Sequence, residues 1–216
     1  MSPAKIIIVF SHLPILITVG YALMVYKKAG AELKTFSWFL FVSGIIQIAS
    51  LVFWFLGKNN FGLLHLYVAL GFICLAWFYN TVLGDFINKK IIWVGATVFL
   101  LFTCINSLFI QKTSSFNSNA LTVECVLVII LSLSTYMFLL NDIVKEKRRD
   151  LIKSLNWINS GLFIYYLSSL LIFYFGDAVT RFFPAHINRY IWVLHSFFSI
   201  VMYCCFFVGL WKRPKA

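Results

Sequence analysis

Charged side chains are scarce in this sequence. Only 12% of its 216 residues are Asp, Glu, Lys or Arg, whereas about 25% is usual in a soluble domain. So few charges cannot cover a surface that faces water. The 62% of hydrophobic residues and the 24 phenylalanines suit a surface that faces lipid instead. The sequence therefore predicts an integral membrane protein, with the lipid bilayer as its main partner.

The sequence also lacks cysteine motifs and long polar segments. Its five cysteines all lie in hydrophobic runs and none forms a C-x-x-C pair, so we expect free, buried thiols. The connections between hydrophobic runs are short and leave no room for a separate extramembrane domain. We therefore expect one domain over residues 1–216, in which any activity belongs to the membrane-spanning part.

Several hydrophobic runs are long enough to cross a bilayer, which takes about 20 apolar residues in a helix. The first is too long for the apolar region of a cleaved signal peptide, and Lys27 and Lys28 follow it rather than precede it. The predicted fold is therefore all-α, a polytopic membrane protein of seven transmembrane helices. The spans lie at about residues 6–26, 36–56, 61–82, 91–110, 120–140, 155–175 and 190–210.

The distribution of basic residues predicts the orientation. With seven spans, one side of the membrane holds 13 of the 18 Lys and Arg residues and the other side holds five. Because cytoplasmic loops carry the excess of basic residues, we expect the N-terminus outside and the C-terminus in the cytoplasm, in a bacterial inner membrane. These residues lie between hydrophobic runs, so the net charge of +11 reflects topology and no nucleic-acid partner is expected.

Four ionisable side chains share one depth in the predicted bundle. They lie about four to six residues into spans that enter from the outer side, which is roughly 6–9 Å below the boundary. These residues are His12, His65, Glu124 and His195. Since a polar group inside a span needs a partner there, the shared depth favours a common pocket that opens to the outer side. We expect the pocket to be lined by Gln47, His65, Asn106, Glu124, Tyr165, Ser169, Trp192, His195 and Ser199.

The function that we favour from the sequence is a sensor or receptor-like module. It would bind a small ligand in the outer pocket and signal through a cytoplasmic partner. That partner would dock on the basic loop after the fifth span, where positive charge also suits anionic lipid. The docking residues that we expect are Lys145, Lys147, Arg148, Arg149 and Lys153.

Other functions fit the same polar layer. A metal-dependent membrane hydrolase that acts on lipid would hold zinc and leave one coordination position for water. Its expected ligands are His12, His65, Glu124 and His195. A haem-binding protein would use His65 and His195 as axial ligands. A structural subunit of a membrane complex is a further alternative.

Short segments of the last third of the chain carry resemblances to known families. The segments 156–161 (NWINSG) and 192–196 (WVLHS) resemble the small seven-helix membrane modules that occur alone or fused to bacterial sensor kinases, which implies signalling. His195 also makes the chain similar to the seven-helix hydrolases of the alkaline ceramidase and adiponectin receptor type. Those carry two histidines four residues apart in the last helix, where this chain has His195 and Ser199. Rhodopsins need a lysine in that helix, and 190–210 contains none, so retinal is not expected.

Overall fold

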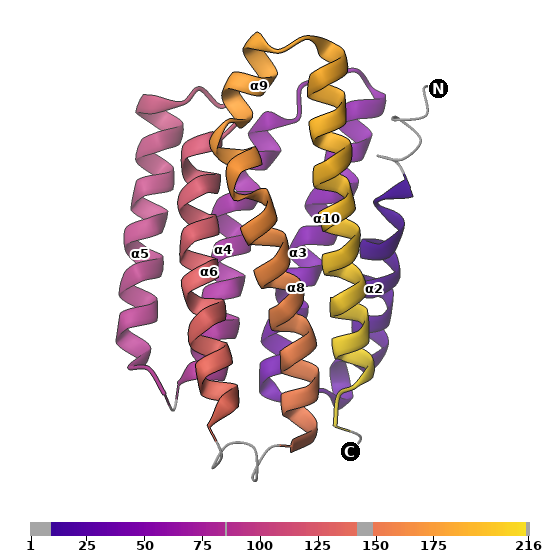
Figure 1. The fold of residues 1–216 in the computed structure, drawn as a ribbon, viewed down its shortest axis with the longest axis vertical. Helices are drawn as coiled ribbons and strands as arrows, with labels where there is room; N and C mark the ends of the chain where they lie inside the picture. The colour runs from indigo at the N-terminus through magenta and orange to yellow at the C-terminus, as the bar shows by residue number, and fades with distance from the viewer. Residues whose placement is uncertain (1–9, 85, 142–148, 215–216) are drawn as a thin grey trace.

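The computed structural model describes residues 10–84, 86–141 and 149–214, which form a bundle of roughly parallel and antiparallel helices (Figure 1). No strand occurs in these ranges. The elements are α2 (Leu13–Val25), η1 (Tyr26–Lys28), α3 (Ala31–Phe55), α4 (Phe61–Leu83), α5 (Lys89–Ile105), the π-helical turn η2 (Asn106–Ile110), α6 (Ser118–Leu140), α8 (Arg149–Tyr174), α9 (Gly176–Phe182) and α10 (Ala185–Trp211).

Six of the described helices are long and apolar enough to cross a membrane. They are α3, α4, α5 with η2, α6, α8 and α10. This finding confirms the prediction of an all-helical membrane protein. The first predicted span, 6–26, falls partly outside the described residues, and its described part is the 13-residue helix α2.

Several helix boundaries follow the turn signals of the sequence. After α3, Gly57 adopts a φ of 66°, a left-handed conformation that glycine reaches without steric cost. The Asn88 side chain caps α5 by accepting a hydrogen bond from the backbone N–H of Lys90. Pro184 precedes α10, where its fixed φ suits a helix start. The short helix α9 lies in a connection for which the sequence predicted no helix.

The bundle has two ends, which we name by their contents. The α9 end carries α9 and the connections 57–60 and 111–117, and the C-terminal end carries η1 and residues 212–214 (Figure 1). Helix α8 packs against both α6 and α10, α3 against α4, and α2 against α3 and α10, whereas α5 lies at the periphery beside α4. Many large apolar side chains on the outer surface are exposed, as lipid contact requires.

The contact between α8 and α10 is very close because glycine lies on both helices. A Cβ atom added to Gly209 would lie 2.6 Å from Cγ1 of Ile158 and 3.0 Å from the carbonyl oxygen of Ser154. The Ser154 hydroxyl donates a 2.6 Å hydrogen bond to the carbonyl oxygen of Gly209. On α8, Gly161 faces Cys205 in the same way. Small residues that let two backbones approach are typical of helix association in membranes.

We therefore predict that Gly209→Ala destabilises the protein by about 1–3 kcal/mol, the usual range for overpacking a filled interior. The added methyl group must displace Ile158 or separate α8 from α10. The measurement is thermal unfolding of the detergent-purified protein.

The matched control for this variant is Gly95→Ala on α5. A Cβ atom there meets no heavy atom within 4 Å, and alanine favours a helix over glycine. Its melting temperature should stay the same or rise slightly. Equal melting of the two variants would contradict the close α8–α10 contact.

Candidate functional site

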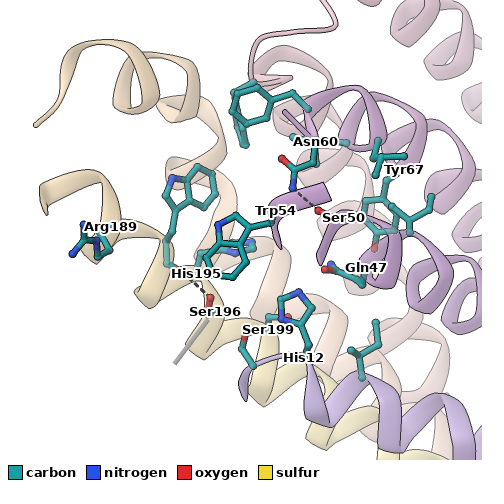
Figure 2. A pocket seen from close by; sticks show the side chains of 18 of the residues that line it. His12, Gln47, Ser50, Trp54, Asn60, Tyr67, Arg189, His195, Ser196 and Ser199 are labelled. Atoms are coloured by element: carbon teal, nitrogen blue, oxygen red, sulfur yellow. Dashed lines mark hydrogen bonds between the residues drawn. The ribbon is translucent and has the colours of Figure 1, made fainter. Parts of the chain in front are cut away.

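A cavity of about 500 Å³ lies at the α9 end, between α2, α3, α4 and α10 (Figure 2). Its size falls within the usual range of small-molecule pockets, roughly 300–1,000 Å³. Aromatic side chains from α3, α4, α10 and the 111–117 connection form its apolar walls. These are Trp54, Phe61, Phe116 and Trp192.

The polar lining comes from α3, α4, α10 and the residues that precede α2. Figure 2 shows three polar side chains directed toward the same space: His12, which precedes α2, Gln47 of α3 and Ser199 of α10. Tyr67 of α4 adds its side chain, and its hydroxyl lies 3.2 Å from the hydroxyl of Ser43. The Gln47 amide forms no hydrogen bond within the described residues, so it is available to a ligand.

The charge of the lining limits the ligand. No Asp or Glu occurs among the described residues that line the cavity, and the only Lys or Arg among them is Arg189, which is exposed. Arg189 lies at one side of the view in Figure 2. A cation would find no counter-charge in this lining, whereas a neutral or anionic ligand would meet hydrogen-bonding groups and the Arg189 guanidinium.

His195 is held at the cavity wall by aromatic neighbours. Its Nε2 atom lies 2.9 Å from the hydroxyl of Tyr165. The rings of Phe173 and Trp192 lie 5.2 and 5.6 Å from the imidazole, centroid to centroid. Trp192 in turn packs on Phe116 at 5.1 Å. This packing fixes the ring orientation, so His195 can present a defined edge to a ligand.

The structure brings together only some of the residues that the sequence placed in one pocket. Gln47, Trp192, His195 and Ser199 line the cavity, and so does His12, which the sequence proposed as a metal ligand. Tyr165 is not part of the lining but contacts it through His195. The residues that lie elsewhere are His65, Asn106, Glu124 and Ser169.

His65 faces away from the cavity. Its Nδ1 atom lies 2.7 Å from the Ser107 hydroxyl of η2, and its Nε2 atom lies 3.2 Å from the carbonyl oxygen of Ser115. His65 therefore anchors η2 through Nδ1 and the 111–117 connection through Nε2. Tyr67, which does line the cavity, is two residues further on and thus ~200° around the same helix. A shared depth does not decide which face of a helix a residue occupies.

Asn106 belongs to a cluster of side-chain amides. Its Nδ2 atom donates to Oδ1 of Asn117 at 2.8 Å and to Oε1 of Gln111 at 3.0 Å, and its Oδ1 atom accepts from Nδ2 of Asn119 at 3.1 Å. The cluster ties η2 to the start of α6. The 111–117 connection also carries Phe116 of the cavity wall, so the cluster helps to hold this part of the wall in place.

Glu124 and Ser169 are buried inside the bundle. Glu124 is 1% exposed, and its Oε1 atom accepts a 3.1 Å hydrogen bond from the Tyr166 hydroxyl of α8. Ser169 is fully buried, and its hydroxyl has no hydrogen-bond partner in the structure. Neither residue reaches the cavity directly.

The four metal ligands proposed from the sequence are not gathered into one site. No group of three or more His, Cys, Asp or Glu side chains within residues 10–84, 86–141 and 149–214 could hold a metal ion. His65 contacts Ser107 and Ser115, His195 contacts Tyr165, and Glu124 contacts Tyr166. The structure therefore does not support the zinc site that the sequence predicted from His12, His65, Glu124 and His195. His65 also does not share the cavity with His195, as a haem between the two would require.

Most of the residues that we expect to dock a cytoplasmic partner lie outside the described part of the chain. Lys145, Lys147 and Arg148 lie outside the described residues, and Arg149 is described only as the first residue of α8. Lys153 is exposed and lies 3.7 Å from the Asp150 carboxylate, as a surface ion pair.

Several lining residues are absent from the pocket that the sequence predicted. Ser50 and Trp54 follow Gln47 at helical spacing, so the sequence alone indicates that the three residues share one face of α3. Tyr67 lies in an apolar run, and Phe116 lies in a connection. For these two residues only the packing of distant segments shows the placement.

No family model, curated protein or solved structure matches the chain.

We predict that Asn106→Leu lowers the stability by about 1–3 kcal/mol, because it leaves Oδ1 of the buried Asn117 side chain without its donor and also removes the hydrogen bond from Asn119. Thermal unfolding in detergent measures this loss. Asn59→Leu is the control, since both hydrogen bonds of the Asn59 side chain are exposed: it donates to the Ser114 carbonyl oxygen and accepts from the backbone N–H of Phe61. Equal stability of the two variants would show that the amide cluster contributes little.

Proposed function

We propose that this protein is a seven-helix membrane sensor or receptor-like module. Its pocket would open to the outer side and it would signal through a cytoplasmic partner. The observation that carries the proposal is the cavity at the α9 end, which combines aromatic walls with hydrogen-bonding groups from α3, α4, α10 and the residues that precede α2. Such a lining suits recognition of a small molecule.

The seventh span and the orientation rest on the sequence together with the arrangement of the bundle. Residues 6–26 form a seventh run of spanning length, and α2 packs against α3 and α10 as a member of the bundle. Basic residues of the described chain gather at the C-terminal end, at 27–34, 89–90 and 212–213. The positive-inside rule then places this end in the cytoplasm and the cavity on the outer side.

A route for signalling runs along α10. This helix contributes Trp192, His195 and Ser199 to the cavity and continues to Trp211 at the opposite end. It packs along α8, and α8 begins beside the basic loop that we expect to meet the partner. A ligand that favours one position of α10 would therefore shift the α8–α10 pair, provided that it binds that position more tightly.

The orientation can be tested with a matched pair of lysines. Lys58→Cys lies in the connection between α3 and α4, and Lys212→Cys follows α10. In intact cells, a membrane-impermeant maleimide should label the cysteine at position 58 and leave position 212 unlabelled until the membrane is opened. The unsubstituted chain, which has five cysteines of its own, sets the background. Labelling of position 212 alone would reverse the proposed orientation.

Ligand binding can be tested by thermal shift with a panel of small neutral and anionic molecules. A ligand present at 100 times its Kd should stabilise the protein by about 2.7 kcal/mol. Ser199→Leu should abolish that shift because the larger side chain fills part of the cavity. Ser134→Leu is the control, since Ser134 is half-buried on α6 outside the cavity lining and donates only to the carbonyl oxygen of Ile130 in its own helix.

Two outcomes would contradict the receptor proposal. A compound that stabilises Ser199→Leu as much as the wild type would bind elsewhere. Stoichiometric zinc in the purified protein that is lost in His195→Ala would favour the hydrolase instead.

Signalling through a partner gives a further expectation. A partner that is captured with the wild type should be lost when the basic residues of 145–153 are replaced, while the ligand-induced shift remains.

A further inference from the structure

Glu124 is the only carboxylate that the sequence places well inside a predicted span, and it does not line the cavity. It lies in the second turn of α6, where the side chain is 1% exposed. An ionisable residue at such a place in a membrane protein is costly and is retained for a function. The question is therefore what this carboxyl group binds.

Within the described residues, no Lys or Arg lies among the groups that surround Glu124. Three tyrosines lie within electrostatic range of it: Tyr67 from α4, and Tyr165 and Tyr166 from α8. On α6 itself the titratable neighbour is Cys125. His65 of α4 is engaged with Ser107 and Ser115. Peripheral α5 contributes no titratable group to the surroundings of Glu124 within the described residues.

The hydrogen bonds at Glu124 match a neutral carboxyl group. The Tyr166 hydroxyl donates to Oε1, whereas the buried Oε2 atom has no hydrogen-bond partner among the described residues. An ionised carboxylate here would have one hydrogen bond and no counter-charge, an unfavourable state in an apolar interior. With a proton on Oε2, the group is uncharged and Oε1 is the carbonyl oxygen that accepts from Tyr166.

Two connections join Glu124 to the cavity. Tyr67 lines the cavity and also lies within electrostatic range of the carboxyl group. On α8, Tyr165 contacts His195 of the cavity wall, and the next residue, Tyr166, holds Glu124. The rings of Tyr165 and Tyr166 lie 5.2 Å apart, centroid to centroid. A displacement of α8 at this point would change both contacts together.

We propose that Glu124 is an exchangeable proton-binding site next to the cavity. At rest the proton is held on Oε2. When Tyr67 or the Tyr165–Tyr166 pair moves, the O–H bond breaks, its electron pair stays on the carboxylate, and a water molecule of the cavity takes the proton. Tyr166 acts as a positioning residue, because its hydroxyl stabilises either form. Coupling of this exchange to a ligand rests on the function proposed above, whereas the proton site itself does not.

The test is infrared difference spectroscopy of the protein in lipid bilayers, recorded between acidic and alkaline medium, with no ligand added. The wild type should show the carbonyl stretch of a protonated carboxyl group at acidic pH and its loss at alkaline pH. Glu124→Gln should lack this band. Tyr166→Phe should retain it at a higher frequency, because the carbonyl oxygen loses its hydrogen bond.

Glu32→Gln is the matched control, since Glu32 lies in the first turn of α3 at the C-terminal end. Its spectrum should keep the band. Identical spectra for the wild type and Glu124→Gln at every pH would overturn the proposal. So would a band that responds to neither pH nor deuterium oxide, because Glu124 would then be a permanently protonated packing group. If Glu124→Gln does not fold, an unshifted band in Tyr166→Phe would still overturn the assignment.

Because no ligand is present, these outcomes are independent of the receptor proposal. If a compound binds in the cavity but Glu124 does not titrate, the receptor proposal is supported and the proton-site proposal is wrong. If Glu124 titrates but no ligand binds in the cavity, the proton-site proposal is supported and the receptor proposal is not.

Discussion

The interior of this bundle must satisfy its polar groups without bulk water, and the rest of the structure follows from that constraint. Many hydroxyl groups meet it locally, as Ser37 and Thr135 do by donating to the carbonyl oxygen four residues earlier. Others meet it between helices. The Tyr79 hydroxyl lies 2.7 Å from that of Ser132 and donates to Oδ1 of Asn159, which joins α4, α6 and α8.

The same constraint separates polar residues that hold the bundle together from those that are available to a ligand. The amides around Asn106 and the imidazole of His65 are committed to partners from the chain. Gln47 of the cavity has no such partner among the described residues. An uncommitted amide beside aromatic walls is a better indicator of a binding site than polarity alone, since most buried polar groups are paired.

The sequence predicted the fold class because hydrophobic runs of spanning length and the turn residues between them are local properties. It also found one wall of the cavity, where helical spacing places Trp192, His195 and Ser199 on one face of α10. It failed at His65 and Glu124, because depth along a helix says nothing about rotation around it. The π-helical turn at 106–110 and the extra helix α9 also depend on packing between distant segments. The seventh span, the orientation and the function remain predictions.

The first and last described helices lie side by side, and this arrangement bears on how the protein is made. The Thr18 hydroxyl of α2 donates to the carbonyl oxygen of Tyr203 on α10 at 3.2 Å, and Arg213 donates to the Tyr21 hydroxyl at 3.0 Å. Residues 11–15 and 185–203 form facing parts of the cavity lining. During synthesis, α2 is therefore made long before α10, the helix on which it packs. The cavity can form only after α10 has been made, because residues 185–203 supply part of its lining.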